Sequence, residues 1–396
     1  MSQRSIAIAG AGIAGLAAAL LLHRDGHRVT VFERFATPQP IGSGLMLQPT
    51  GLAVLGALGL ADQILSRGRR IDRMFGRVLP SRRAVLDLSY RSLAPDAFGL
   101  AVHRATLFEP LFEAVQRSAI AIETGRTVAA TPDGDGRLVF DNGGQAGPFD
   151  LVVDALGMRS PLGTGGRSDL AYGALWTTLP WPNGRFDDHA LEQRYERASV
   201  MIGVLPIGRR SDNGPDETAF FWSLKPADYN TWRAGGLDAW KARVRNLWPE
   251  TDVLLDRIDS PDQMTLARYA HHTTMRPFRK RFVSIGDSAH AASPQLGQGG
   301  NMALLDAYAL ALALRTSGDV ADALKIYAGL RRSHIRFYQA MSATFTPFYQ
   351  SDSRVLPWLR DWFVAPATGL PVVRGFTAAM VAGTIFDPRR TLGLMS

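Results

Sequence analysis

Apolar and polar positions follow two different periods within the first 35 residues. Short apolar runs at 5–9 and 28–33 flank a glycine-rich turn and a longer apolar stretch at 14–24. Short runs bounded by turn residues are typical of strands, whereas an apolar stretch of that length favours a helix. The pattern predicts strand, helix and strand in succession, the unit from which parallel sheets are built.

Further along the chain, alternating strand-like segments and one helical pattern follow each other. Two alternating segments between 72 and 89 flank Pro80 and Ser81, which predicts a hairpin. Apolar residues in 103–118 recur on one face of a helix. Short strands separated by Asp and Gly turns are predicted at 120–123, 137–141 and 149–154.

A third pattern, rich in tryptophan, occupies residues 171–272. Strand-like segments here include ALWTTLPW, SVMIGVLPIG and TAFFWSLK. We expect a mainly antiparallel sheet with helices, inserted before the chain returns to its first domain near residue 281. Beyond residue 335 the periodicity predicts a helical tail, which is apolar and aromatic and broken by prolines.

The composition narrows the chemistry. With 46% hydrophobic and 20% charged residues among 396, the chain is globular. It contains no cysteine, which excludes disulfides, zinc–thiolate sites, catalytic thiols and iron–sulfur clusters. No His, Asp and Glu cluster has the spacing of a metal site, so we expect no metal. No apolar run is long enough to span a bilayer, and we expect a cytoplasmic protein without a membrane partner.

The net charge of +8 comes almost wholly from arginine. The arginines are scattered, and no basic run carries interleaved aromatic residues. We therefore expect no nucleic-acid partner and favour attraction for anionic small molecules.

The turn after the first strand has the spacing G-x-G-x-x-G. Gly10 permits a tight turn, Gly12 lets the backbone approach a pyrophosphate, and Gly15 lets helix and strand pack closely. Ile13 and Ala14 begin the helix, whose N-terminus offers unpaired N–H groups to phosphates.

An acid ends the second strand, where a dinucleotide ribose would lie. The Glu33 carboxylate can accept hydrogen bonds from ribose hydroxyls, and Arg34 follows it. Because strand, helix, second strand and acid occur in this order, the segment predicts a dinucleotide site rather than an ordinary glycine-rich turn.

A second glycine-rich segment, FVSIGDSAHAASPQLGQGGNMALLDA, spans residues 282–307. An apolar strand ends in Gly-Asp, a loop with one Pro and several Gly follows, and an apolar helix begins near Asn301. A linker would not be bracketed by such apolar elements. We infer a loop shaped around a bound molecule.

The two segments together resemble the FAD-dependent aromatic monooxygenases of the para-hydroxybenzoate hydroxylase type, the group A flavoprotein hydroxylases. The resemblance covers most of residues 3–315 and also rests on VHRATLFEPL at 102–111. It implies an α/β fold, in which a Rossmann-type FAD-binding domain carries an inserted, mainly antiparallel β-sheet substrate domain and a helical C-terminal region. The expected boundaries are 1–75, 98–168 and 274–335 for the first, 76–97 and 169–273 for the second, and 336–396 for the third.

The resemblance also implies a cofactor site built from both segments. Asp287 would bind the ribityl hydroxyls, Pro294 would stiffen the loop, and the loop glycines would let a flat ring lie against backbone. Backbone N–H groups and a helix dipole would stabilise the negative charge of the reduced flavin. The implied FAD-binding residues are Gly10, Gly12, Ile13, Ala14, Gly15, Glu33, Arg34, Ser43, Gly44, Arg104, Asp287, Pro294, Gly297, Gly299, Gly300 and Asn301.

The substrate would lie between the flavin and the second domain. For Trp176 and Trp222 a place in the sheet core is the alternative, and for His290 a structural role is the alternative to catalysis. No general base is identified, so the catalytic residues stay unknown. The substrate-pocket candidates are Met46, Gln48, Trp176, Met201, Trp222 and Leu296.

The chain departs from the family pattern in one place. The family usually carries Ala-Asp-Gly-x-x-Ser after its middle strand, with an Asp linked to FAD and to nicotinamide cofactor use. Here LVVDALGMRSPL places Leu156 at that position and Asp154 two residues earlier. Leucine cannot accept hydrogen bonds from cofactor hydroxyls. The expectation of FAD stands, while its reduction by NADH or NADPH is left open.

The resemblance implies a monooxygenase reaction. NADH or NADPH would reduce FAD, O2 would form a C4a-hydroperoxyflavin, and one oxygen would pass to an aromatic or polyketide-like small molecule. One alternative is an FAD-dependent reductase or dehydrogenase of the same fold that uses no oxygen. Another is a non-catalytic flavin-binding protein, which Leu156 keeps open. We expect a monomer or a homodimer.

Overall fold

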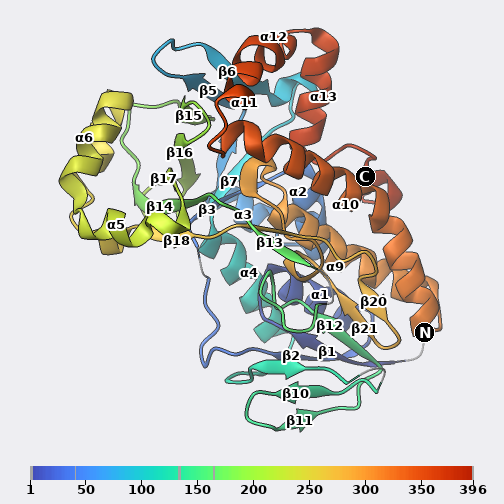
Figure 1. Cartoon of the computed structure of the whole chain (residues 1–396). Helices are drawn as coiled ribbons and strands as arrows, with labels where there is room; N and C mark the ends of the chain where they lie inside the picture. Colours follow the sequence, from blue (N-terminus) through green and yellow to red (C-terminus); the bar gives the residue numbers. More distant parts are fainter. Residues whose placement is uncertain (1–2, 41, 133–134, 164–165, 395–396) are drawn as a thin grey trace.

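A six-stranded sheet lies in the lower half of the molecule in Figure 1. The computed structural model describes residues 3–40, 42–132, 135–163 and 166–394. The strand order is β20-β21-β12-β1-β2-β8, and neighbouring strands are parallel except for β20 against β21. The strands are β1 (Ser5–Ala9), β2 (Arg28–Phe32), β8 (Ala121–Glu123), β12 (Leu151–Asp154), β20 (Phe278–Arg279) and β21 (Phe282–Ser284).

The alternation of side chains along β1 divides this sheet between two layers. Ile6 and Ile8 pack against the helical layer, whereas Ala7 and Ala9 face a small antiparallel sheet on the other side. The predicted strand–helix–strand opening is confirmed. The helices of the first layer are α1 (Ile13–Arg24), α2 (Pro49–Leu58), α3 (Ala61–Arg67), α4 (Arg104–Arg117) and α9 (Gly299–Thr316), and the small sheet comprises β9 (Val128–Ala130), β10 (Leu138–Phe140) and β11 (Gln145–Ala146).

A seven-stranded sheet in the order β18-β14-β17-β16-β15-β5-β6 forms the second unit. Neighbouring strands of this sheet are antiparallel except for the parallel pair of β15 and β5. The predicted hairpin at 72–89 corresponds to β5 and β6 and lies at one end of the sheet. The strands are β5 (Arg73–Val78), β6 (Ala84–Ser89), β14 (Gly173–Pro180), β15 (Ala190–Glu196), β16 (Val200–Gly208), β17 (Glu217–Leu224) and β18 (Thr265–Ala267).

One face of the seven-stranded sheet packs against helices, shown in yellow in Figure 1, and the other faces the centre of the molecule. Residues on β17 therefore alternate between a tryptophan-rich core and the interior. The helices are α5 (Tyr229–Ala234), α6 (Leu237–Leu247) and α7 (Asp252–Leu255), with single 3-10 turns at Tyr90–Ser92, Pro226–Asp228, Pro249–Thr251, Pro261–Gln263 and Pro294–Leu296. Two smaller antiparallel sheets join β3 (Gly44–Leu47), β7 (Gly99–His103) and β4 (Arg69–Ile71), and β13 (Arg167–Asp169) and β19 (Ala270–His272).

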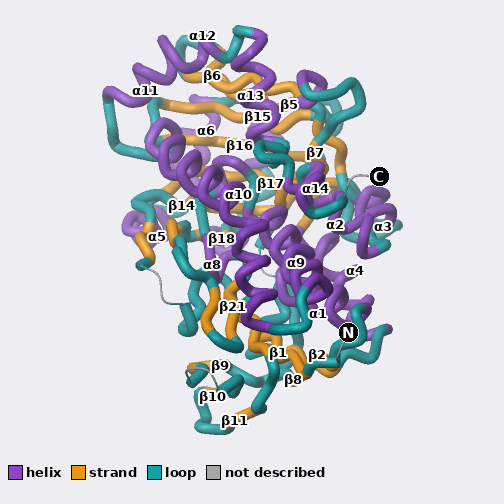
Figure 2. Tube along the Cα trace, turned by 90° about the vertical axis from the view of Figure 1, so that its right-hand side faces the viewer, coloured by secondary structure: helices purple, strands orange, loops and turns teal. Residues whose placement is uncertain are grey.

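The C-terminal region is helical, as predicted, and crosses both units. The long helix α10 (Val320–Tyr349) rises from the first sheet toward the second (Figure 2), and the proposed division at 335/336 falls inside it. No single described helix is long and apolar enough to cross a membrane; 355–367 and 371–381 pass that test only as a pair, bent by 110°. The shorter elements are α8 (Asp287–His290), α11 (Val355–Leu359), a π-helical turn (Arg360–Val364), α12 (Ala365–Ala367), α13 (Pro371–Val381) and α14 (Pro388–Thr391).

Candidate functional site

A cavity of about 1310 Å³ lies between the two units. Its walls come from the β1–α1 turn, β3, the inner face of the seven-stranded sheet, the loop at 287–300 and the C-terminal helices. It exceeds the ~300–1,000 Å³ typical of a single small-molecule site, so it has room for more than one ligand.

Glycine in the β1–α1 turn serves two purposes. Gly10 has φ +104°, and a Cβ on it would lie 2.6 Å from the Ala155 carbonyl oxygen. A Cβ on Gly15 would lie 2.0 Å from the Gly10 oxygen, so neither position tolerates a side chain. Gly12, in contrast, lines the cavity, and a Cβ there would meet nothing within 4 Å. Ile13 and Ala14 continue the wall as α1 begins.

The acid at the end of β2 supports this turn. The Glu33 carboxylate accepts hydrogen bonds from the backbone N–H groups of Ala11 (2.9 Å) and Phe35 (3.0 Å) and is 9% exposed. Each oxygen retains a lone pair for a ligand hydroxyl. Arg34 is exposed, and its guanidinium lies over the Phe35 ring, 4.5 Å from its centroid. Gly10, Gly15, Glu33 and Arg34 do not line the cavity themselves.

The loop after β21 is held from behind by a buried ion pair. Asp306 is fully buried and accepts from the Gly286 N–H (2.8 Å), His290 Nε2 (2.5 Å) and Arg331 Nε (2.6 Å). Burial opposes its charge, but His290 and Arg331 hold the pKa of Asp306 well below its usual range. This fixes the position of Asp287, whose side chain lies in the cavity wall. His290 is buried behind the loop, which agrees with a structural role.

The glycines of the loop leave open space in front of α9. A Cβ on Gly300 would meet nothing within 4 Å, and one on Gly299 would meet only the Asp287 carboxylate, at 3.8 Å. Gly297 has φ +61° and lies, like Pro294 and Leu296, in the cavity wall. The N-terminus of α9 therefore faces the cavity with no side chain in front of it.

Asn301 holds this loop against β3 rather than lining the cavity. Its Oδ1 accepts from the Gln48 N–H (2.7 Å), and its Nδ2 donates to the carbonyls of Met46 (3.0 Å) and Gly297 (2.9 Å). The side chain is fully buried. Its contribution to a cofactor site is to position the loop.

The segment around Leu156, which departs from the family pattern, is held by hydrogen bonds to a buried carboxylate. Asp154 is fully buried and accepts from the Leu156 N–H (3.1 Å), Ser160 Oγ (2.8 Å) and Ser284 Oγ (3.1 Å). Burial raises the pKa of Asp154 and the hydrogen bonds lower it, with a net rise. Asp154 stabilises the turn but does not line the cavity, whereas Gly157 lines it. The Leu156 side chain packs beside the small sheet of β9, β10 and β11.

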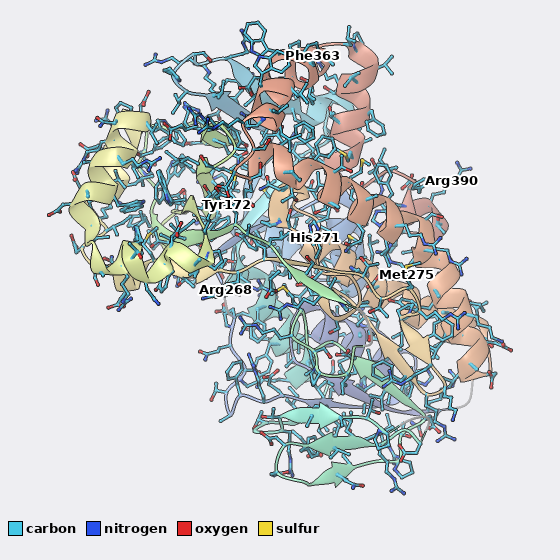
Figure 3. The ribbon with its side chains drawn as sticks, viewed as in Figure 1. Tyr172, Arg268, His271, Met275, Phe363 and Arg390 are labelled. Carbon is cyan, nitrogen blue, oxygen red and sulfur yellow. The ribbon has the colours of Figure 1, made fainter. Side chains whose placement is uncertain are left out.

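Positive charge without a partner lies at the side of the cavity. Arg104, at the start of α4, donates its backbone N–H to the Ser43 carbonyl (2.9 Å), and Ser43 shares a hydroxyl hydrogen bond with Thr178 (2.8 Å). Arg268, labelled in Figure 3, also lines the cavity. Within the described ranges, neither guanidinium forms an ion pair. Ser43 and Gly44 line the same wall.

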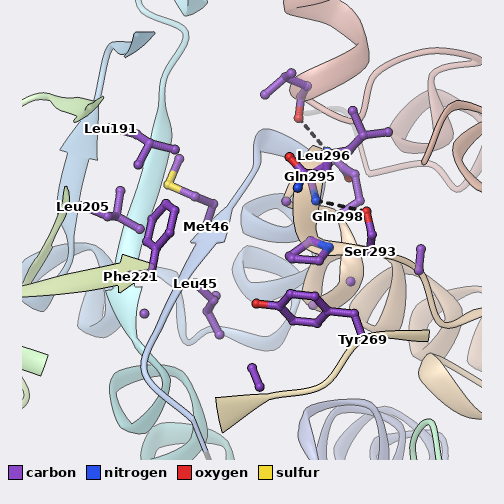
Figure 4. Close-up of a pocket in the computed structure, with 18 of the residues that line it drawn as sticks. Leu45, Met46, Leu191, Leu205, Phe221, Tyr269, Ser293, Gln295, Leu296 and Gln298 are labelled. Atoms are coloured by element: carbon purple, nitrogen blue, oxygen red, sulfur yellow. Dashed lines mark hydrogen bonds between the residues drawn. The ribbon is translucent and has the colours of Figure 1, made fainter. Parts of the chain in front are cut away.

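The inner face of the sheet supplies an aromatic and apolar surface opposite the loop (Figure 4). Met46, Gln48, Trp176 and Met201 all line the cavity, and their role as substrate-pocket residues stays a prediction. Trp222 does not line the cavity. It points to the other face of β17 and packs edge-to-face against Trp240, which agrees with the sheet-core alternative and removes Trp222 from the pocket candidates. Its neighbour Phe221 takes that place, because successive residues of a strand face opposite ways.

Several cavity residues had no clear sequence signal. Tyr269 accepts a hydrogen bond from Trp176 Nε1 (2.8 Å), and burial raises its pKa, so the phenol stays neutral. Alternation along β17 could have identified Phe221 if the inner face had been known. The apolar C-terminal tail favoured packing over the two domains, but its sequence did not indicate that α12 and α13 line the cavity itself. Among the described residues, no group of three or more His, Asp or Glu side chains is arranged to hold a metal ion.

The residues present fit FAD. Gly12, Gly299 and Gly300 leave open space where the cofactor would press against backbone, and two helix N-termini face that space. Arg104, which is unpaired among the described residues, matches the FAD phosphates, and the free lone pairs of Glu33 match a ribose.

Comparison with known proteins agrees with this geometry. A family model described as an FAD binding domain matches residues 3–146 and 152–335. The 2-heptyl-3-hydroxy-4(1H)-quinolone synthase of Pseudomonas aeruginosa is 28% identical over 384 residues, 91% of this chain and 93% of that one. Aurachin C monooxygenase/isomerase of Stigmatella aurantiaca is 25% identical over 378 residues, covering 90% and 92%.

Among solved structures, Klebsiella pneumoniae HpxO complexed with FAD and uric acid superposes with a TM-score of 0.79. It is 22% identical, and the match covers 96% of this chain and 97% of that one. At this identity the likeness establishes the fold, and the α/β class with its inserted sheet is confirmed.

Proposed function

The chain belongs to the FAD binding domain family, and on that premise we propose that it is a monooxygenase that hydroxylates an aromatic or heteroaromatic small molecule with O2 and NAD(P)H. The family match confirms the resemblance inferred from the sequence, and with it FAD as cofactor. One observation carries the proposal: a single cavity joins the open glycine cradle to an aromatic and apolar wall. The quinolone and aurachin enzymes among the relatives support a heteroaromatic substrate.

The chain's own residues divide the work of holding FAD. Gly12 and the N-terminus of α1 would take the pyrophosphate, Glu33 a ribose and Asp287 the ribityl hydroxyls. Gly299 and Gly300 would leave the ring in contact with backbone. Bound FAD supplies two-electron redox chemistry and the activation of O2.

The overall reaction balances with one reductant. The substrate C–H, O2, NAD(P)H and a proton give the C–OH product, water and NAD(P)+. Trp176, Phe221 and Met201 would hold the substrate ring and exclude water, which would otherwise divert O2 to hydrogen peroxide. Arg268, which forms no ion pair with any described residue, supports a site for the phosphates of the nicotinamide cofactor at the side of the cavity, whereas Arg104 would lie at the FAD phosphates.

An anaerobic titration tests the proposal. The purified flavoprotein would receive NADH or NADPH, with and without a panel of phenols, quinolones and aromatic acids, while the flavin absorbance is followed. We expect bleaching that one aromatic class accelerates at least tenfold. A flavin that neither nicotinamide bleaches with any compound would instead favour the non-catalytic flavin-binding alternative, with Leu156 as its cause.

For assembly and location we propose a monomer or homodimer in the cytoplasm. The absence of cysteine supports a reducing compartment. Light scattering coupled to gel filtration would test the assembly; a stable tetramer would contradict it. Fractionation of the source cells would test the location.

A further inference from the structure

The cavity does not end at the aromatic wall. It continues as an arm between the β5–β6 hairpin and the C-terminal helices α12 and α13. We call this the apolar arm and define it by Met74, Val85 and Leu88 on the sheet side and Ala367, Val373 and Val381 on the helix side. At its outer end lie Phe363, 60% exposed, and Phe376, 46% exposed, and Phe363 stands at the far end of the molecule in Figure 3.

Polar side chains along the arm are already satisfied within the protein. Tyr349 donates to the Val85 carbonyl (3.3 Å), Thr377 Oγ1 to the Val373 carbonyl (3.0 Å) and Thr368 Oγ1 to the Ala365 carbonyl (2.6 Å). Because these hydroxyls donate to backbone, the wall offers a ligand mainly apolar contacts. A polar ligand group placed against this wall would lose its hydrogen bonds to water and gain none from the protein.

The end of the cavity beside the loop at 287–300 is polar, in contrast to the apolar arm. Gln48 is fully buried, its Oε1 accepts from the Tyr90 hydroxyl (2.7 Å), and its Nε2 has no hydrogen-bond partner among the residues that the structure describes. Gln295 Nε2 is likewise buried without a partner in the described part of the chain. Both residues line the cavity. An unpaired buried amide is costly, and an acceptor on a bound ligand would satisfy it.

We propose that the substrate is an amphiphile, an extension that rests on the function proposed above. Its heteroaromatic head would carry an oxygen acceptor, such as a ring carbonyl, toward Gln48. Its aliphatic tail of several carbons would lie along the apolar arm toward Phe363 and Phe376. The head places the reacting carbon, and burial of the tail supplies most of the affinity.

A homologous ligand series tests the arm without turnover. The FAD-loaded enzyme would be titrated with 4-quinolones that carry 2-alkyl chains from methyl to nonyl, and binding would be read from tryptophan fluorescence and flavin absorbance. We expect the Kd to fall about two- to fourfold per methylene until the arm is filled, and then to level off. A Kd independent of chain length overturns the proposal.

Two variants that narrow the arm sharpen the test. Ala367→Phe and Thr377→Phe should each weaken binding of the heptyl compound at least tenfold and leave the methyl compound within about twofold. Val372→Phe is the matched control, because Val372 is 85% exposed on the same helix as Thr377 and does not line the cavity. Melting temperatures would show that each variant is folded. Equal weakening of both compounds overturns the proposal.

The outcomes separate the two proposals. Chain-length dependence without acceleration of flavin reduction by any compound of the series or of the aromatic panel would retain the arm and reject the hydroxylase. Hydroxylation of short-chain and long-chain compounds with equal Kd values would retain the hydroxylase and reject the arm.

Discussion

The cavity has two glycine-rich sides, and they differ in why they need glycine. In the β1–α1 turn, a Cβ added to Gly10 or Gly15 would lie only 2.6 or 2.0 Å from a backbone carbonyl oxygen. In the loop before α9, a Cβ on Gly300 would meet nothing within 4 Å. Gly10 and Gly15 are required for the first turn to fold, whereas Gly300 in the second segment has no steric need to be glycine without a ligand.

The two sides also differ in what holds them. The β1–α1 turn is stabilised by close packing and by the backbone hydrogen bond from the Gly10 N–H to the Phe32 carbonyl (2.8 Å). The loop relies on buried side chains, chiefly Asn301 and Asp306. Stability and cofactor affinity should therefore respond separately to substitutions on the two sides.

The largest effect is expected at Gly15. A methyl group there would meet the Gly10 carbonyl, which cannot move without displacing β1 or α1, so Gly15→Ala should lower the free energy of unfolding by about 3 kcal/mol or more. Urea unfolding of the apoprotein would measure it. Gly12→Ala is the control from the same turn and should leave that free energy nearly unchanged while weakening FAD binding. Equal losses from both would contradict the distinction.

Asn301→Ala should have the next largest effect. It removes three hydrogen bonds, two of them buried, and leaves the Gln48 N–H and two carbonyls without that partner, a loss of about 2–3 kcal/mol. Asn301→Asp retains the acceptor for the Gln48 N–H but sets a buried carboxylate against the carbonyls of Met46 and Gly297, so it should lose at least as much stability as the alanine variant at neutral pH. Calorimetry of both apoproteins would measure the losses, and unchanged stability of Asn301→Ala would show that Asn301 does not brace the loop.

Gly300→Ala should separate stability from affinity. Alanine is the better helix former by up to about 1 kcal/mol, and its methyl group has open space, so the apoprotein should be as stable as the parent or slightly more so. The same methyl group would occupy the space assigned to FAD and raise its Kd at least tenfold. Fluorescence titration of the apoprotein with FAD would measure this; unchanged affinity would remove Gly300 from the cofactor site.

The N-terminus of α4, which also lines the cavity, is capped by a titratable group. His103 Nδ1 accepts the Ala105 N–H (3.0 Å) at the start of α4, and burial, helped by Arg210, lowers the pKa of His103 to about 4. Because the unfolded chain binds that proton near pH 6.5, the free energy of unfolding should fall as the pH drops from about 6.5 toward 4. The slope should be at most about 1.4 kcal/mol per pH unit.

His103→Asn keeps a capping acceptor but cannot take up a proton in this range. Urea unfolding at several pH values should therefore show a shallower acid loss for the variant than for the parent. Parallel curves would mean that His103 does not contribute to the acid sensitivity.

Sequence reasoning succeeded where local pattern and fold agree. The bounds of β1, α1 and β2 match the prediction to within one residue, because glycine spacing and apolar runs determine that unit locally. It left two places open for Trp222, since alternation gives two faces of β17 but not which one meets the cavity. It also did not foresee the apolar arm, which forms only when α12 and α13 pack beside a hairpin almost 300 residues earlier in the chain, a contact that no local period records.

The most direct test of the central claim follows the oxygen atoms. The holoenzyme would be given NADH or NADPH and the aromatic compound that best accelerates flavin reduction, under 18O2 in unlabelled water. The account predicts a hydroxylated product with one 18O atom, and no label when unlabelled O2 is used in H218O. Oxygen recovered only as hydrogen peroxide, or a hydroxyl group derived from water, would contradict it.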